Sequence, residues 1–190
     1  MSRTIHHVSR INPFEICRIA DIGDVPFSES HIPDAAIAEI EKFFRGVFAS
    51  GAVPLSAGGD HSITYPIFLA IGAENPLGMV HIDAHTDTWD EWQGSKFNHG
   101  APFRRAVEAG VLDPKRTIQI GIRGSQNFTD GWDFSLDHGM RVIFMEEFTE
   151  IGVKSVIEEA RRVVGDGPTY VSFDVDGLDP VYAPGTGTPE

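Results

Sequence analysis

Three short segments of the sequence concentrate the carboxylate and imidazole side chains that bind metal ions or move protons. They are residues 58–61 (GGDH), 83–87 (DAHTD) and 174–176 (DVD), and each follows an apolar stretch of strand length. In an extended segment, side chains two residues apart point to the same side. The two aspartates and the histidine of 83–87 therefore share one face, as do the two aspartates of 174–176.

The density of carboxylates in these segments points to bound cations. Five aspartates occur in them, and carboxylates that converge on one site repel one another and are costly to bury without partners. No lysine or arginine stands beside them in the sequence. A pair of divalent metal ions is the natural compensation, and oxygens with imidazoles suit Mn²⁺ better than an ion that prefers thiolates. With the two histidines there are seven candidate ligands, too many for one tetrahedral zinc.

Two residues near these segments have a simpler interpretation. Asp60 can cap the start of a helix, with His61 as a residue at the helix start. His81 lies on the same strand face as Asp83 but inside the strand, which favours a core histidine with satisfied hydrogen bonds. A single Asp-x-His or Asp-x-Asp pattern is most often solvated or capping, so it is the joint occurrence at three strand ends that favours a metal site.

The elements that must position these segments alternate along the chain. Hydrophobic spacing predicts strands over 16–22, 53–57, 77–83, 117–122, 141–145 and 169–175, and helices over 34–50, 62–72, 103–109 and 153–164, the second interrupted near Pro66. Six strands alternating with helices predict a mostly parallel sheet covered on both faces. Ligands bind beyond the carboxyl ends of such strands, where the three segments fall. The long irregular stretch 87–101 is typical of a functional loop.

Composition limits the partners of the chain. Its 190 residues suit one domain, and its net charge of −13 makes it a poor binder of nucleic acid or anionic membranes. No apolar run has the length of a membrane span, and the N-terminus has no signal-peptide core. The single Cys17 cannot form an internal disulfide, which indicates a reducing compartment. We therefore expect a cytoplasmic protein that binds neither nucleic acid nor membrane.

The segments closely resemble the signatures of the ureohydrolases, the arginase and agmatinase family. The resemblance rests on residues 58–62 (GGDHS), 83–87 (DAHTD), 172–180 (SFDVDGLDP) and 183–189 (APGTGTP), and it covers about residues 16–190. It implies an arginase-like three-layer α/β/α fold with a mostly parallel sheet, truncated at both ends, so that 1–190 is a single incomplete domain. A homo-oligomer, trimer or hexamer, is also implied.

The resemblance implies a binuclear manganese site with two Mn²⁺ per chain. His61, Asp83, Asp87 and Asp174 would hold one ion, and Asp83, His85, Asp174 and Asp176 the other, so that two aspartates bridge. His99, in the sequence Asn98-His99-Gly100, is similar to the proton-shuttling catalytic histidine of the family. No cofactor besides the metal is implied.

The substrate class follows from the same resemblance. Residues 87–103 are more similar to the agmatinases and the related guanidinobutyrases and guanidinopropionases than to the arginases. We expect an enzyme of the agmatinase type, which hydrolyses agmatine to urea and putrescine, a compound of polyamine metabolism. A guanidinobutyrase or guanidinopropionase acting on a guanidino acid is the alternative, as is a non-catalytic fragment of such an enzyme. The carboxylate that grips the guanidinium group in the family is missing downstream, and Glu190 does not match its motif. A hydrolase of the related deacetylase fold, with one zinc on Asp83, His85 and Asp174, would leave His61 and Asp87 unexplained.

Overall fold

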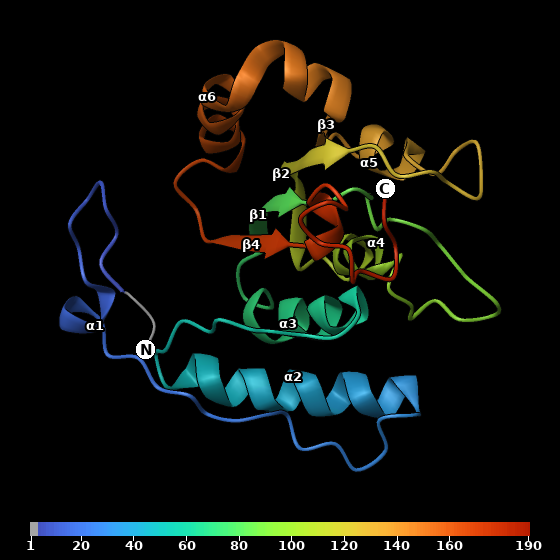
Figure 1. Ribbon diagram of the computed structural model, residues 1–190. Coiled ribbons are helices and arrows are strands. Elements are labelled where there is room, and N and C mark those ends of the chain that lie inside the picture. The colour runs from blue at the N-terminus through green and yellow to red at the C-terminus, as the bar shows by residue number, and fades with distance from the viewer. Residues whose placement is uncertain (1–3) are drawn as a thin grey trace.

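A computed structural model describes residues 4–190 of the chain (Figure 1). The helices are α1 (Pro13–Ile16), α2 (Pro33–Ala49), α3 (Thr64–Ile71), α4 (Pro102–Glu108), α5 (Asp133–Asp137) and α6 (Met145–Val164). The strands are β1 (Leu77–Ile82), β2 (Leu112–Ile122), β3 (Arg141–Phe144) and β4 (Thr169–Phe173). Two short 3₁₀ turns, η1 (His61–Ile63) and η2 (Val175–Gly177), complete the regular elements of the described residues.

The four strands form one parallel sheet in the order β3-β2-β1-β4. β1 lies inside the sheet, between β2 and β4, and its residues are buried or nearly so. In a parallel sheet all carboxyl ends meet at one edge, so the residues that follow β1 and β4 leave the sheet at neighbouring positions. The predicted parallel α/β sheet is confirmed.

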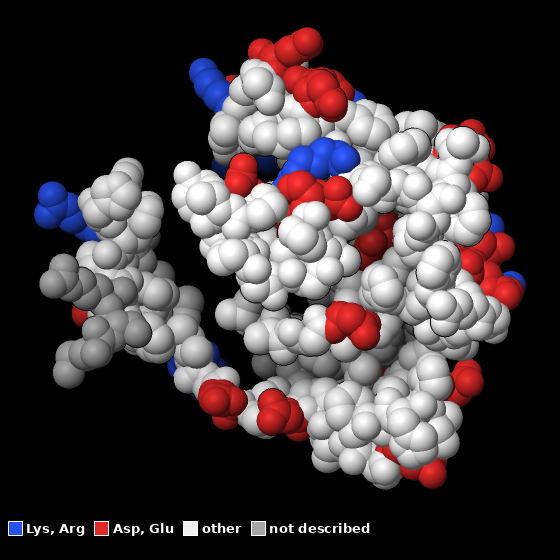
Figure 2. All heavy atoms as spheres, turned by 45° about the vertical axis from the view of Figure 1, so that its right-hand side comes forward, with Lys and Arg blue, Asp and Glu red and all other residues white. Residues whose placement is uncertain are grey.

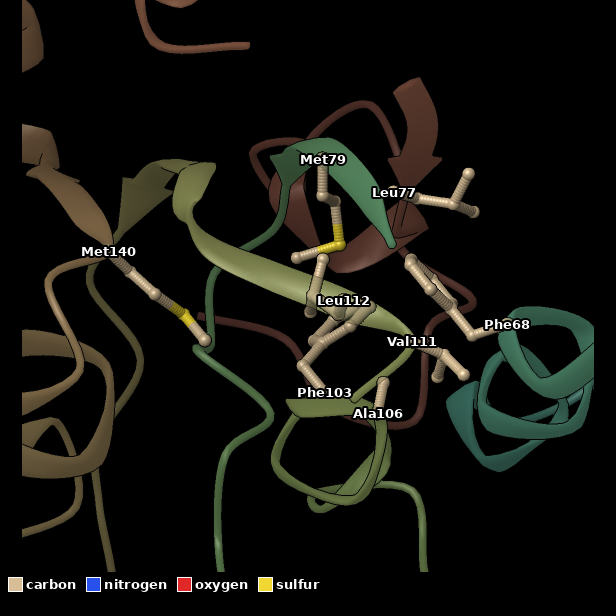
Figure 3. Close-up of a cluster of buried hydrophobic side chains, with 8 residues drawn as sticks. All are labelled: Phe68, Leu77, Met79, Phe103, Ala106, Val111, Leu112 and Met140. Atoms are coloured by element: carbon tan, nitrogen blue, oxygen red, sulfur yellow. The ribbon is translucent and has the colours of Figure 1, made fainter. Parts of the chain in front are cut away.

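Helices cover both faces of the sheet, in three layers (Figure 1). On one face α3 and α4 pack against the sheet through a cluster that includes Phe68, Met79 and Phe103 (Figure 3). On the other face α6 packs on β2 and β3 through Val156 and Ala160. Full burial of one large apolar side chain contributes about 1.5–3 kcal/mol, so these two clusters hold the strands, and with them the strand ends, in place.

A third cluster joins α2 to the outer side of α3, through Ile40 and Phe44 of α2 and Ile67 and Ala70 of α3. The prediction of a helix over 34–50 is confirmed. The helix begins at Pro33, where the missing N–H of proline costs nothing, because the first N–H groups of a helix have no partner within the helix. Acidic side chains are spread over the face drawn in Figure 2, in line with the net charge of −13. In the described residues no helix is both long and apolar enough to cross a membrane.

Two predicted strands are absent from the described structure. Residues 16–22 and 53–57 form no strand, and their apolar side chains are exposed, Val53 by 93% and Leu55 by 100%. Both segments lack a neighbouring strand to pair with, and without a neighbour a β-favouring sequence has no stable extended state. The outer edge of β4 is also unpaired, and Val171 and Phe173 are exposed there.

Two helix predictions also need correction. Pro66 does not interrupt its helix, because it falls in the first turn of α3, where its missing N–H costs no hydrogen bond. The predicted helix over 153–164 is present as the second part of α6; a first part from Met145, which ends at a break at Gly152 with a positive φ of 76°, was not predicted. That backbone conformation favours glycine, so the segment before the break extends the helical layer at an angle that a straight helix would not reach.

Candidate metal centre

The sheet brings the second and third acidic segments together. The last residues of β1 and β4, Ile82 and Phe173, lie opposite each other in parallel register. Asp83 and Asp174 follow directly, and the amide of Asp174 donates to the main-chain oxygen of Ile82 at 2.9 Å. The convergence of these two aspartates at the carboxyl edge is therefore built by ordinary strand pairing.

The first segment reaches the same edge from the helical layer. Asp60 caps η1, and its carboxylate accepts a hydrogen bond from the amide of Ser62 at 2.9 Å. The capping role considered for Asp60 in the sequence is thus the one the structure shows. His61, the first residue of η1, reaches across to β4, where its Nε2 lies 2.8 Å from Ser172 Oγ. The hydroxyl fixes the direction of this imidazole.

The other ring nitrogen of His61 faces three carboxylates. Nδ1 lies 2.8 Å from Asp87 Oδ2, 3.3 Å from Asp83 Oδ2 and 3.4 Å from Asp174 Oδ2. This nitrogen is buried and makes no hydrogen bond of good geometry within the described residues. If Nε2 donates its hydrogen to Ser172, the lone pair of Nδ1 points toward the three carboxylates. One imidazole nitrogen and three carboxylate oxygens are together a suitable set of ligands for a metal cation.

A second imidazole lies on the other side of Asp83. His85 Nδ1 is 3.1 Å from Asp176 Oδ2 and 3.5 Å from Asp83 Oδ1. Asp176 is itself held by the amide of Ala84 at 3.2 Å and by the hydroxyl of Thr188 at 2.8 Å. One oxygen of Asp83 thus faces His61 and the other faces His85, which is the geometry of a carboxylate between two cation positions.

The charges of this cluster shift its pKa values strongly. Burial opposes protonation of His61, but the nearby carboxylates of Asp83 and Asp87 outweigh burial and raise its pKa to about 10. Hydrogen bonds to Asp176 and Asp83 raise the pKa of His85 to about 11, against burial. For Asp83, burial is outweighed by the neighbouring imidazoles, His81 first, which hold its pKa well below the ordinary value. The carboxylates therefore stabilise positive charge nearby, either as protons on the imidazoles or as cations bound between the side chains.

The pKa of Asp87 is raised, whereas that of Asp83 is lowered. The Asp87 side chain is only 11% exposed, and burial raises its pKa, while the His61 ring 2.8 Å away acts in the other direction. A carboxylate that is this poorly solvated has more to gain from a cation than an exposed one.

His99 lies beside this cluster, with no hydrogen bond or ion pair to its six predicted ligand residues among the described contacts. It is exposed and lines a cavity of about 240 Å³ together with Asp60 and Ser62, the two residues that flank His61. The loop is fixed next to it, because the Asn98 side chain accepts from the amide of Gly100 at 3.0 Å. The shuttle role of His99 stays a prediction.

Three further residues contact the cluster and were not singled out as functional by the sequence. His81 is buried with both ring nitrogens in hydrogen bonds, as the sequence predicts, and its Nε2 lies 2.7 Å from Asp83 Oδ2. Gln119 of β2 contacts the other side of the His81 ring. Arg123 donates to the main-chain oxygen of Asp176 at 3.0 Å. Only His81 had a signal in the sequence, its place on the face of Asp83.

Comparison with known proteins assigns the chain to a family. The profile described as "Arginase family" matches residues 1–190. The chain belongs to the arginase family.

Individual relatives within this family have the following similarities to the chain. The chain is 58% identical to the guanidinopropionase of Pseudomonas aeruginosa, over 100% of this chain and 60% of that protein, and 49% identical to the mitochondrial agmatinase of Gallus gallus, over 94% and 52%. Among solved structures, that of Trypanosoma cruzi formiminoglutamase "with Mn2+2" matches with a TM-score of 0.86 and 25% identity, over 100% of this chain and 63% of that one. The chain thus spans between half and two thirds of the length of these relatives.

The raised pKa values predict a linkage between metal and protons. Because both pKa values are raised, we expect His61 and His85 to be protonated at pH 7 in the metal-free chain. A ligating imidazole is neutral, so a divalent metal ion such as Mn²⁺ that binds both should release about two protons per chain. The apparent affinity should therefore rise with pH. Calorimetric titration in buffers of different ionisation enthalpy measures the release; binding without proton release would contradict the assignment of both imidazoles.

The same shifts set the pH dependence of the metal-free fold. Both folded-state pKa values lie above the ordinary value of 6.5. Their stabilising contribution is therefore complete below about pH 6.5 and is lost as the pH rises through the folded values near 10 and 11.

Proposed function

We propose that this chain carries the binuclear manganese site of an amidinohydrolase that cleaves a guanidino compound to urea and an amine. The observation that carries the proposal is the position of Asp83, whose two oxygens face the two imidazoles His61 and His85. Membership of the arginase family and the neighbour described with Mn2+ support the same assignment.

The residues present fit two metal ions. His61, Asp83, Asp87 and Asp174 surround the first position, and Asp83, His85, Asp174 and Asp176 would hold the second. The set consists of carboxylate oxygens and imidazole nitrogens without thiolate, which favours Mn²⁺ over a soft-ligand ion. Bound Mn²⁺ supplies Lewis acidity, which lets water attack the guanidinium carbon near neutral pH.

The side chains of the protein position the metal ions and transfer the proton. Asp83 and Asp174 keep the two cation positions close together, because both are fixed to adjacent strands. We assign the proton transfer to the leaving amine to His99, which lines the cavity of about 240 Å³ together with Asp60 and Ser62. Asp83 and Asp176 are 1% and 4% exposed, so little bulk water reaches these two carboxylates to screen their charges.

The substrate class we propose is a guanidino acid, with agmatine second. The relative named guanidinopropionase is 58% identical, against 49% for the relative named agmatinase. The two classes differ at the far end of the substrate, where a guanidino acid carries a carboxylate and agmatine an ammonium group. We therefore propose a guanidino acid first and agmatine, the expectation from the sequence, second.

The test is a substrate panel with Mn²⁺-loaded protein, scored by urea release from 3-guanidinopropionate, 4-guanidinobutyrate, agmatine and arginine. We expect the highest kcat/KM for one of the two acids. The matched control is Asp176→Asn, which keeps the shape of a proposed ligand and removes its charge. If the loaded protein contains two Mn²⁺ per chain and releases urea from none of the four compounds, the proposed function is wrong for this chain. One metal ion per chain at saturation would instead favour the single-zinc alternative.

Two further sequence predictions stay predictions. A homo-oligomer is tested by light scattering of the purified protein. The cytoplasmic location rests on the single Cys17 and is tested by fractionation of the source cells.

A further inference from the structure

Behind the carboxylate cluster, a row of hydrogen bonds connects Asp83 to two buried polar side chains that the proposed chemistry does not use directly, His81 and Gln119. Gln119, His81 and Asp83 are 0%, 0% and 1% exposed. Gln119 Nε2 lies 3.1 Å from His81 Nδ1, and His81 Nε2 lies 2.7 Å from Asp83 Oδ2. The row runs from the middle of β2 across β1 to the strand end, since His81 and Gln119 are paired in the register of the two strands.

The direction of these hydrogen bonds follows from the contact between Gln119 and Thr86. Gln119 Nε2 also lies 2.6 Å from the main-chain oxygen of Thr86, which can only accept. The amide atom at this position must therefore be the nitrogen, because an amide oxygen would repel the carbonyl. Its two hydrogens go to Thr86 O and to His81 Nδ1.

The tautomer of His81 is fixed in consequence. Nδ1 accepts from Gln119, so the ring hydrogen is on Nε2 and is donated to Asp83 Oδ2. Phe103 packs against the ring with a centroid distance of 4.4 Å and prevents it from turning away. The donated hydrogen bond selects one orientation of the Asp83 carboxylate, the one in which Oδ1 remains turned toward His85.

The same hydrogen also excludes His81 from the metal ligands. The ligand atoms of His61, His81 and Asp83 lie within 4.8 Å of one another and could by distance alone hold an ion. A ring nitrogen that carries a hydrogen has no lone pair for a metal. His81 thus belongs behind Asp83 and not beside the metal.

We infer that His81 and Gln119 are positioning residues that hold the shared carboxylate Asp83 in the orientation needed to contact two metal ions. The inference rests on the proposed function for its consequence but not for its geometry. Hydrogen-bond partners of metal ligands commonly change metal affinity about 10- to 100-fold when they are removed. Gln119 acts through two bonds, because it also ties the 83–87 loop to β2 at Thr86.

The first experiment determines the tautomer in the metal-free protein. Long-range ¹H–¹⁵N correlation spectra of the imidazole rings should show His81 with its hydrogen on Nε2, and Gln119→Met should abolish this fixed preference. A hydrogen on Nδ1 in the wild-type chain would overturn the inference, whatever the protein does with metals.

The second experiment measures Mn²⁺ affinity and the thermal unfolding of each metal-free variant. Gln119→Met and His81→Leu should bind Mn²⁺ about 10- to 100-fold more weakly. His81→Gln, whose amide can still donate to Asp83, should recover most of the affinity. The matched control is Thr117→Val, which removes a buried hydroxyl of β2 that bonds to Asp113 O. It should lose stability without losing metal affinity.

The outcomes separate the two claims. Wild-type affinity in Gln119→Met, or an equal loss of affinity in Thr117→Val, would show that His81 and Gln119 only fill the core. If the wild-type chain binds no Mn²⁺, the proposed function fails, and the tautomer measurement still decides whether the Gln119–His81–Asp83 chain exists as described.

Discussion

Replacing Asp83 by asparagine is expected to remove both Mn²⁺ ions from the protein. The side chain keeps its shape but loses the charge that faces His61 with one oxygen and His85 with the other. A metal that binds only the folded state at 100 times its Kd stabilises that state by about 2.7 kcal/mol, so two ions contribute about 5 kcal/mol that this variant should no longer gain. Metal analysis after gel filtration and thermal unfolding with and without Mn²⁺ measure the two effects.

Two matched variants make this prediction specific. Asp176→Asn, which touches only the His85 side of the cluster, should weaken mainly one ion. Asp60→Asn should leave both in place, because the Asp60 carboxylate caps η1 and asparagine caps a helix start equally well. Retention of one full equivalent of Mn²⁺ in Asp83→Asn would show that this aspartate is not shared.

Replacing His99 by alanine is expected to lower kcat about 10²- to 10⁴-fold while both metal ions stay bound. His99 is exposed beside the cavity and makes none of the described contacts to the carboxylate cluster, so its loss leaves the ligand set untouched. A proton donor to the leaving amine acts in the transition state, which lowers kcat rather than metal content. Steady-state kinetics measures the loss of kcat, and metal analysis of the same preparation measures the retained Mn²⁺. Both are done with a form of the protein that hydrolyses its substrate.

His138→Ala is the control for this variant. That histidine hydrogen-bonds to the main-chain oxygen of Phe134 at the end of α5 and should be kinetically silent when removed. Added imidazole should restore part of the rate of His99→Ala but not alter that of His138→Ala. A parallel loss of Mn²⁺ in His99→Ala would identify His99 as structural.

The part of the fold predicted correctly is the part whose strands find neighbours. β1 and β4 were recognisable because apolar stretches end abruptly in aspartates, at Asp83 and at Asp174. The same pattern of apolar residues over 16–22 and 53–57 predicted strands that the structure lacks. Strand formation depends on pairing with residues far away in sequence, and a local pattern carries no information about whether that partner is there.

The candidate site shows the same division. The six predicted ligand residues converge in the structure, because strand ends and a capped turn leave little freedom to their positions. Gln119 could not be found from the sequence, since one glutamine in an apolar strand has no spacing to reveal it. Its importance comes only from the register that places it opposite His81.

The pairing of β4 with β1 alone has a consequence for how the cluster comes apart. Among residues 4–190, β4 pairs with β1 alone, whereas β1 lies between two strands. Edge elements with few partners open locally at a lower free energy than the centre of a sheet. When the end of β4 frays, Asp174 and Asp176, which follow it, move away, while Asp83, His85 and Asp87 stay in the segment that follows β1. Transient opening at one edge of the sheet and dissociation of a bound ion would then be the same event, and the lifetime of the loaded state would be set by how long this strand stays attached.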